Sequence, residues 1–229
     1  MAHYKISATF LNSFLQNNKY HGFMDILLKK YSPSCYTEWG CYFEDFLDAY
    51  YHNPEAGFVL PDYQSDNCAF RSYVDTGKAI LTEEIFKHWC KEIGDDTVWQ
   101  EWMRKDIEVD GDTFTIIGKP DIYSRSQNRI MDLKTALRNP PANKYAESVQ
   151  HPMYIWMTGI PHFDYLIHSR QKPEVIFKQS FEMEPEVAEE IIVGAIKKAM
   201  AYLNANPPLK NLFVKNFTLD PDAEVFRHR

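Results

Sequence analysis

The sequence predicts a mixed α/β fold of the α+β kind. Two observations indicate it. Helical periodicity dominates the first 95 residues, and the remainder alternates short apolar, strand-like runs with helical segments. The strand-like runs are bounded by turns rich in Asp, Gly, Ser and Asn. We expect residues 1–229 to form one domain, with a mainly helical part over 1–95 and a sheet core with helices over 96–229.

In the first part, helices are predicted over residues 6–31, 36–52 and 78–93. Pro33 separates the first two, because proline disfavours helical geometry in the residue before it. The segment 53–67 is rich in Pro, Gly and Asn and is expected to be a loop. Gly94 is expected to end the third helix.

In the second part, the expected elements are five strands and two helices. The strands are predicted over 98–109, 113–124, 128–135, 163–169 and 174–183. Tight turns at 110–112 and 125–128 join the first three strands. One helix is expected over 143–158, and a last helix from Pro185 to about Asn204, where apolar residues form one stripe.

The composition is that of a folded protein and excludes several functional classes. Hydrophobic residues make up 45% of the chain, and no run of 18 apolar residues or secretory leader is apparent, so no membrane association is expected. The four cysteines show no Cys-x-x-Cys spacing and are expected to be reduced thiols in the cytoplasm. A net charge of −7 argues against a general nucleic-acid coat but permits a nucleic-acid enzyme with metal ions and a local basic groove.

The stretch "FTIIGKPDIYSRSQNRIMDLKTA", residues 114–136, places charged residues in strand-like surroundings. Side chains alternate along a strand, so Asp132 and Lys134 share one face. A short hairpin would bring Asp121 close to Asp132. Two carboxylates and a backbone carbonyl form a hard oxygen site for Mg²⁺ or Mn²⁺. A neighbouring lysine could position or deprotonate a water and stabilise an anionic phosphate.

The alternative interpretation is a surface hairpin with a solvated Asp–Lys pair. The apolar flanks oppose it, because they place the acids where burial is expected, and a buried acid without a partner is costly. In the following helix, Gln150 and Tyr154 lie four residues apart and therefore on one face.

These motifs resemble the PD-(D/E)xK nuclease superfamily, in its RecB-like and phage (lambda-type) exonuclease branch. The family pattern is an early helical acid, then G-x-x-D, [DE]-x-K and Q-x-x-x-Y. In this chain the matching stretches are "GCYFE" with Glu44, "GKPD" with Asp121, "DLK" with Asp132 and Lys134, and "QHPMY" with Gln150 and Tyr154.

The resemblance implies a restriction-endonuclease-like core, a central mixed sheet flanked by helices. It implies metal ligation by Asp121, Asp132, Glu44 and the main-chain carbonyl of Leu133, with Mg²⁺ or Mn²⁺ as the ion. Lys134 would be catalytic, and Gln150 and Tyr154 would lie beside the DNA or the lysine.

The early acid has a rival, because Glu83 and Glu84 lie on a helix that is nearer in sequence to the strands. No G-x-x-x-H motif is present, and Glu44 fits the glutamate variant of the phage exonucleases. No cysteine follows Cys90, so no iron–sulfur cluster is expected, and no glycine-rich phosphate loop indicates a nucleotide cofactor. Lys144 and Arg138 flank the motifs and are the preferred DNA contacts.

The expected function is therefore a metal-dependent DNA nuclease that hydrolyses phosphodiester bonds, an exonuclease of the phage recombination or replication type. The alternatives are an endonuclease of the same fold and a non-catalytic DNA-binding protein on a nuclease fold. Besides DNA, a single-strand annealing or replication protein and further copies of the chain are candidate partners. A phage-encoded chain would act in the cytoplasm of its bacterial host.

Overall fold

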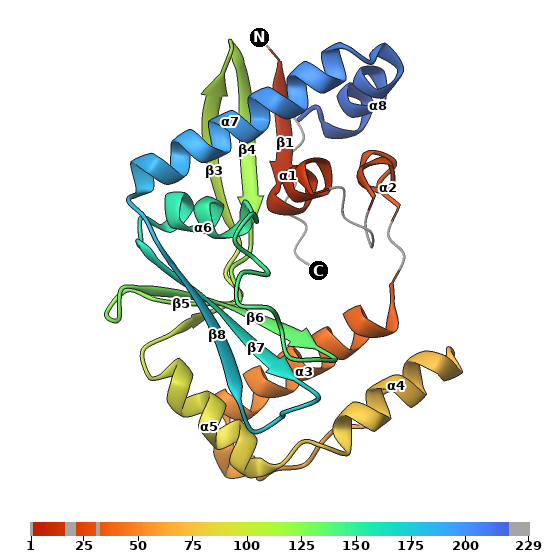
Figure 1. The fold of residues 1–229 in the computed structure, drawn as a ribbon, viewed down its shortest axis with the longest axis vertical. Helices are drawn as coiled ribbons and strands as arrows, with labels where there is room; N and C mark the ends of the chain where they lie inside the picture. The colour runs from red at the N-terminus through yellow and green to blue at the C-terminus, as the bar shows by residue number, and fades with distance from the viewer. Residues whose placement is uncertain (1, 17–21, 31–32, 220–229) are drawn as a thin grey trace.

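A computed structural model describes residues 2–16, 22–30 and 33–219 of the chain (Figure 1). The strands are β1 (His3–Ser7), β2 (Val98–Trp99), β3 (Met103–Val109), β4 (Asp112–Gly118), β5 (Ile122–Ser124), β6 (Arg129–Ala136), β7 (His162–Ser169) and β8 (Ile176–Glu182). The helices are α1 (Ala8–Leu15), α2 (Phe23–Leu27), α3 (Cys35–His52), α4 (Cys68–Lys78), α5 (Glu83–Ile93), α6 (Gln150–Thr158), α7 (Pro185–Asn204) and α8 (Pro207–Phe217), with a 3₁₀ turn η1 (Pro54–Ala56).

The strands form two mixed sheets, which confirms the predicted mixed α/β class. The smaller has the order β1-β4-β3, and the larger has the order β2-β5-β6-β7-β8. Each contains one parallel pair, β1 with β4 and β6 with β7, while the other neighbours are antiparallel. In Figure 1, α3 and α5 lie against the larger sheet with α4 beside α3, and the other helices gather around the smaller sheet.

Two apolar clusters pack against opposite faces of β6 and β7. One joins α1, α6, α7 and α8 to the smaller sheet and contains Ile130 and Phe163. The other joins α3, α4 and α5 to the larger sheet and contains Met131 and Leu133. This alternation along β6 matches the predicted strand period and leaves Asp132 on the Ile130 face.

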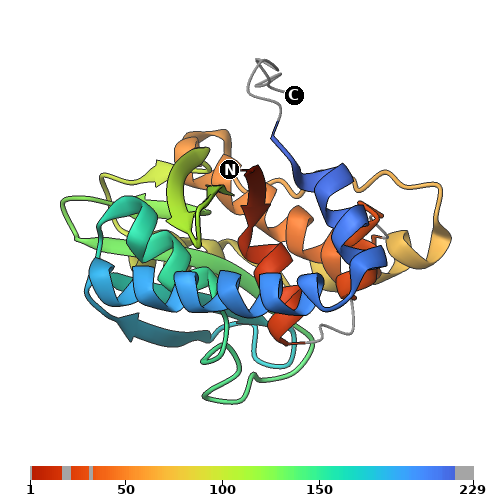
Figure 2. The same cartoon turned by 90° about the horizontal axis from the view of Figure 1, so that it is seen from above.

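Helix α7 closes the first cluster. Figure 2 shows it running across the molecule beside α6 and α1, which are two of the helices that it contacts. Its buried positions recur at helical spacing, as the predicted stripe requires. Among the described residues, no helix has both the length and the apolar character needed to cross a membrane.

The predicted helix over 6–31 is wrong in its described part. Residues 3–7 form a strand, Ser7 caps α1, and a separate helix follows at 23–27, while residues 17–21 and 31 lie outside the described chain. The strand escaped prediction because its partner, β4, lies more than a hundred residues away. Helices α4 and α8 were not predicted. Because α8 follows α7, the helix from Pro185 is not the last one of the described chain, although it had been expected to be.

Several predicted boundaries shift for local reasons. Helix α5 begins at Glu83 rather than residue 78, because the Thr82 side chain caps its first turn. The predicted strand over 98–109 breaks between β2 and β3, and the one over 113–124 breaks at 119–121. Helix α6 begins at Gln150, so 143–149 is not helical as predicted, whereas α3, β6, β7, β8 and α7 lie where expected.

Candidate active site

The hairpin between β5 and β6 brings Asp121 and Asp132 together, as predicted. Ile122 pairs with Met131 in the antiparallel ladder, so the next step of the register sets Asp121 opposite Asp132. The Asp121 Oδ2 atom accepts a hydrogen bond of 2.7 Å from the backbone N–H of Leu133. Asp121 immediately precedes β5, so its carboxylate lies beside β6 at the point where the pairing of β5 with β6 ends.

The same edge exposes the carbonyl of Leu133. In an antiparallel ladder, the N–H and C=O of one residue point to the same neighbouring strand, so this carbonyl faces Asp121. Continuing the register would set Pro120 opposite Leu133, and proline has no N–H to donate. A carbonyl oxygen is thus left beside two carboxylates.

Asp132 is the most tightly held of the acids. It is 1% exposed, and its Oδ1 atom accepts a 2.6 Å hydrogen bond from Gln150 Nε2 at the start of α6. Its Oδ2 atom forms an ion pair with Lys134, two residues along the same face of β6. Gln150 was expected beside the DNA or the lysine; here it orients the aspartate that pairs with that lysine.

Tyr154 holds the backbone of Lys119, two residues before Asp121, through two hydrogen bonds. Its hydroxyl donates to the carbonyl of Lys119 (3.0 Å) and accepts from the N–H of the same residue (3.2 Å). The ring is buried and stacks on Phe163. A Cβ on Gly118 would lie 2.6 Å from Tyr154 Cε1, so only glycine lets the ring approach this closely. Tyr154 thus contacts the backbone rather than offering an open face.

Glu44 reaches the cluster from α3, which covers the other face of β6. Its Oε1 atom accepts a 2.7 Å hydrogen bond from Gln100 Nε2. The alternative acids lie in the first turn of α5, where Glu83 bonds to Tyr50 and Lys87 and Glu84 is exposed. The geometry favours Glu44 as the early acid.

The acids perturb one another electrostatically. Burial raises the pKa of Asp121 well above its usual range, and the charges of Asp132 and Glu44 raise it further. Burial also raises the pKa of Asp132 and, together with the charge of Asp132, that of Glu44. Burial alone would lower the pKa of Lys134, but Asp132 and Asp121 outweigh burial and hold that pKa above its usual value. Crowded carboxylates favour protons or a cation.

The donor set suits a hard divalent cation, since it consists of carboxylate and carbonyl oxygens. In the present side-chain arrangement, no three His, Cys, Asp or Glu side chains of the described chain are grouped closely enough to hold one ion. Gln100 occupies one oxygen of Glu44, Lys134 pairs with Asp132, and Leu133 holds one oxygen of Asp121. Asp121, Asp132 and the Leu133 carbonyl form the core of the candidate site, and Glu44 stands beside it.

Two neighbours of the site were missed from the sequence. Continuing the β2–β5 register places Gln100, just after β2, opposite Asp121, just before β5, and Tyr165 on β7 pairs with Asp132. Tyr165 is fully buried, and burial followed by the Asp132 charge raises its pKa. Neither residue belongs to a motif, and only the cross-strand pairing reveals them.

The predicted DNA contacts, Arg138 and Lys144, lie on the exposed connection between β6 and α6. The Lys144 ammonium lies over the ring of Tyr145 at 5.1 Å, and that ring stacks on Tyr165. Gln179 ties the same connection to β8 through Pro141 and Tyr145. Both basic residues therefore belong to a segment that is anchored beside the acidic cluster.

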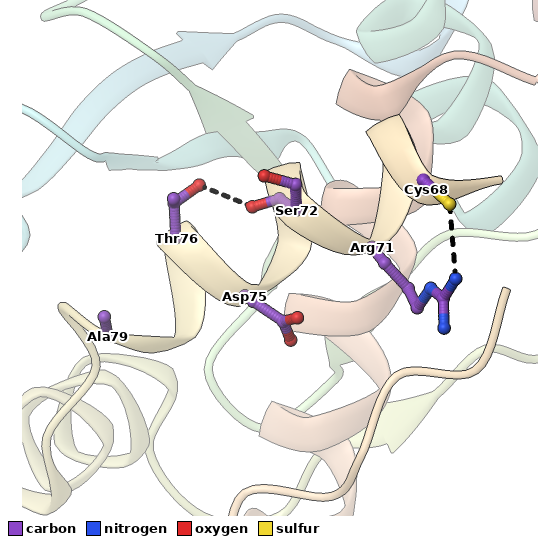
Figure 3. Close-up of a pocket in the computed structure, with 6 residues that line it drawn as sticks. All are labelled: Cys68, Arg71, Ser72, Asp75, Thr76 and Ala79. Carbon is purple, nitrogen blue, oxygen red and sulfur yellow. Dashed lines mark hydrogen bonds between the residues drawn. The ribbon is translucent and has the colours of Figure 1, made fainter.

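A hollow of about 640 Å³ lies elsewhere, on the exposed face of α4 (Figure 3). Five residues of that helix and the residue that follows it line the hollow: Cys68, Arg71, Ser72, Asp75, Thr76 and Ala79. Arg71 Nη2 donates to Cys68 Sγ across one turn. None of the lining residues belongs to the acidic cluster. The four cysteines are free thiols on α3, α4 and α5.

No protein-family model matches the chain, and no curated protein matches it. Among solved structures, a putative exonuclease from Eubacterium rectale is similar at 15% identity and a TM-score of 0.48, covering 92% of this chain and 82% of that one. An alkaline exonuclease from Laribacter hongkongensis has 12% identity, a TM-score of 0.43 and 92% coverage of both chains. A phage-related exonuclease from Haemophilus somnus has 14% identity, a TM-score of 0.37, and coverage of 89% and 96%. These values give no ground for transferring an activity to this chain.

Proposed function

We propose that this chain is a Mg²⁺- or Mn²⁺-dependent deoxyribonuclease that hydrolyses phosphodiester bonds in DNA. One observation carries the proposal. Asp121 faces Asp132 at the edge of β6, beside the carbonyl of Leu133, with Lys134 on the Asp132 face. Buried acids that repel one another need a counter-charge, and a divalent cation provides it.

In this proposal, Asp121, Asp132 and the carbonyl of Leu133 hold the cation, and Glu44 completes its surroundings. When bound, the ion supplies Lewis acidity toward water and toward the phosphate oxygens. The aspartates raise the pKa of Lys134 and so favour its protonated form. Its proposed role is to stabilise the negative charge that develops on the phosphate.

The remaining motif residues have supporting roles. Gln150 keeps Asp132 oriented toward the ion, and Tyr154 fixes the backbone before Asp121. Lys144 and Arg138 contact the DNA backbone from the connection between β6 and α6. As a finer hypothesis, suggested by the motif resemblance, the enzyme is an exonuclease of phage recombination or replication.

The test is a cleavage assay with end-labelled linear DNA and closed circular DNA, each with Mg²⁺, Mn²⁺, Ca²⁺ or a chelator. We expect cleavage with Mg²⁺ and Mn²⁺ and none with the chelator, and an exonuclease will spare the circle. Lys134→Met should remove activity, whereas Lys87→Met should not, because Lys87 is an exposed lysine paired with Glu83. Cleavage that persists in excess chelator, or absence of cleavage with every ion, would refute the proposal.

A further inference from the structure

Gln100 belongs to no motif, yet it stands next to the proposed metal ligands. Trp99 pairs with Ile122 in the ladder between β2 and β5, so the next pair is Gln100 with Asp121. The Gln100 N–H donates to the Asp121 carbonyl at 2.9 Å, which extends the ladder by one bond. The backbone of Gln100 therefore fixes the position of the residue that carries the first acid.

The side chain of Gln100 joins two charged groups. Its Nε2 atom donates to Glu44 Oε1 at 2.7 Å, and its Oε1 atom accepts from Lys119 Nζ at 2.8 Å. An ammonium can only donate and a carboxylate can only accept. Only one orientation of the amide satisfies both partners, so Lys119 determines which end of Gln100 faces Glu44.

The backbone at Gln100 is left-handed, with φ of 51°. A residue with a Cβ is strained in this conformation. Such strain persists where surrounding contacts hold it, commonly at functional sites. Here the left-handed turn ends β2, and its side chain is bonded to Glu44 on α3.

We propose that Gln100 is a positioning residue for Glu44, which holds that carboxylate toward the divalent-cation site of Asp121 and Asp132. The inference rests on the proposed function, because it assigns Glu44 a role at that cation. Groups that orient metal ligands typically contribute 10–100-fold to metal affinity. Gln100 is thus expected to act on the affinity for the ion rather than on the chemistry.

The experiment is a calorimetric titration of the metal-free protein with Mn²⁺, without DNA. Gln100→Met keeps the length of the side chain and removes both hydrogen bonds, and Gln100→Gly removes the side chain while suiting the left-handed backbone. Both should bind Mn²⁺ about tenfold more weakly than the wild type. Gln127→Met is the matched control, since that glutamine donates to Asp95 in another loop, and its affinity should not change.

A second measurement separates positioning from loss of structure. In both Gln100 variants, the Mn²⁺ concentration for half-maximal cleavage should rise about tenfold, while the rate at saturating Mn²⁺ stays near that of the wild type. Wild-type binding with unchanged affinity in both variants would overturn the inference and leave the proposed function standing. A wild-type protein that binds no divalent ion would overturn the proposed function and the inference with it.

Discussion

Acid should loosen the packing of α3 on the larger sheet through a single histidine, His168 on β7. This side chain is fully buried, and neither ring nitrogen has a hydrogen-bond partner. It stacks on Phe43 of α3, with ring centroids 4.5 Å apart. Phe43 directly precedes Glu44 in the chain. Burial, followed by the nearby charge of Arg170, lowers the pKa of His168 from 6.5 to about 4.

The size of the effect follows from that pKa. Between pH 6.5 and about 4, the unfolded chain takes up a proton on this ring and the folded chain does not. The contribution of His168 to the free energy of unfolding therefore decreases as the pH falls through this interval, by about 1.4 kcal/mol for each pH unit. Over the whole interval the loss is about 3 kcal/mol, a large part of the stability of a typical domain.

The assay is urea unfolding of the wild type and His168→Phe between about pH 7 and pH 4.5. Phenylalanine keeps a flat ring against Phe43 and cannot be protonated, so this variant should lose markedly less stability on acidification. His162→Gln is the control, because His162 lies on the same strand but is 46% exposed. Parallel losses in the wild type and His168→Phe would refute the assignment of the acid sensitivity to this ring.

Four further predictions concern the site. Lys134→Met should lower the cleavage rate roughly 10²–10⁴-fold with unfolding little changed; a near wild-type rate would remove the lysine from the chemistry. Glu44→Gln should weaken Mn²⁺ binding measured by calorimetry, and Glu83→Gln should not; the reverse ranking would move the early acid to α5. Burial raises the pKa of all three site acids, and repulsion by neighbouring carboxylates adds to it for Asp121 and Glu44; the contribution of these acids to the stability of the metal-free protein should therefore fall as the pH rises above about 4, and the gain in melting temperature from Mn²⁺ should grow with pH, so an equal gain at low and high pH would contradict this. Gly118→Ala should destabilise by roughly 1–3 kcal/mol in thermal unfolding, because its Cβ would meet the Tyr154 ring; Tyr154→Phe, which loses hydrogen bonds only, should cost about 1 kcal/mol. Unchanged melting in both variants would argue against this role of Tyr154.

The local part of the site could be predicted from the sequence. The strand period places Asp132 and Lys134 on one face, and the short hairpin places Asp121 opposite Asp132; the structure has both arrangements. These depend on neighbours within about a dozen residues. The sequence could indicate which face of α6 carries Gln150, but not that its amide bonds to Asp132.

The rest of the arrangement depends on contacts between distant segments. The residues of strand β1 were predicted to be helical, because the sequence does not show that β4 pairs with them. The place of Gln100 beside Asp121 follows only from the ladder that pairs β2 with β5. Its left-handed backbone interrupts the run over 98–109, which was predicted as one strand. No residue pattern marks a glutamine as the partner of a glutamate 56 positions earlier in the chain.

Three residues before Asp121 explain why the acids meet at this edge of the sheet. Gly118 gives the Tyr154 ring the space to approach, and the Tyr154 hydroxyl then holds the backbone of Lys119. Pro120 cannot donate to Leu133, so the ladder stops there and the Asp121 carboxylate takes over the Leu133 N–H. The G-x-x-D stretch therefore limits the β5–β6 ladder and leaves the Asp121 carboxylate beside the carbonyl of Leu133. A second carboxylate on the neighbouring strand is then enough to create a site that calls for a cation.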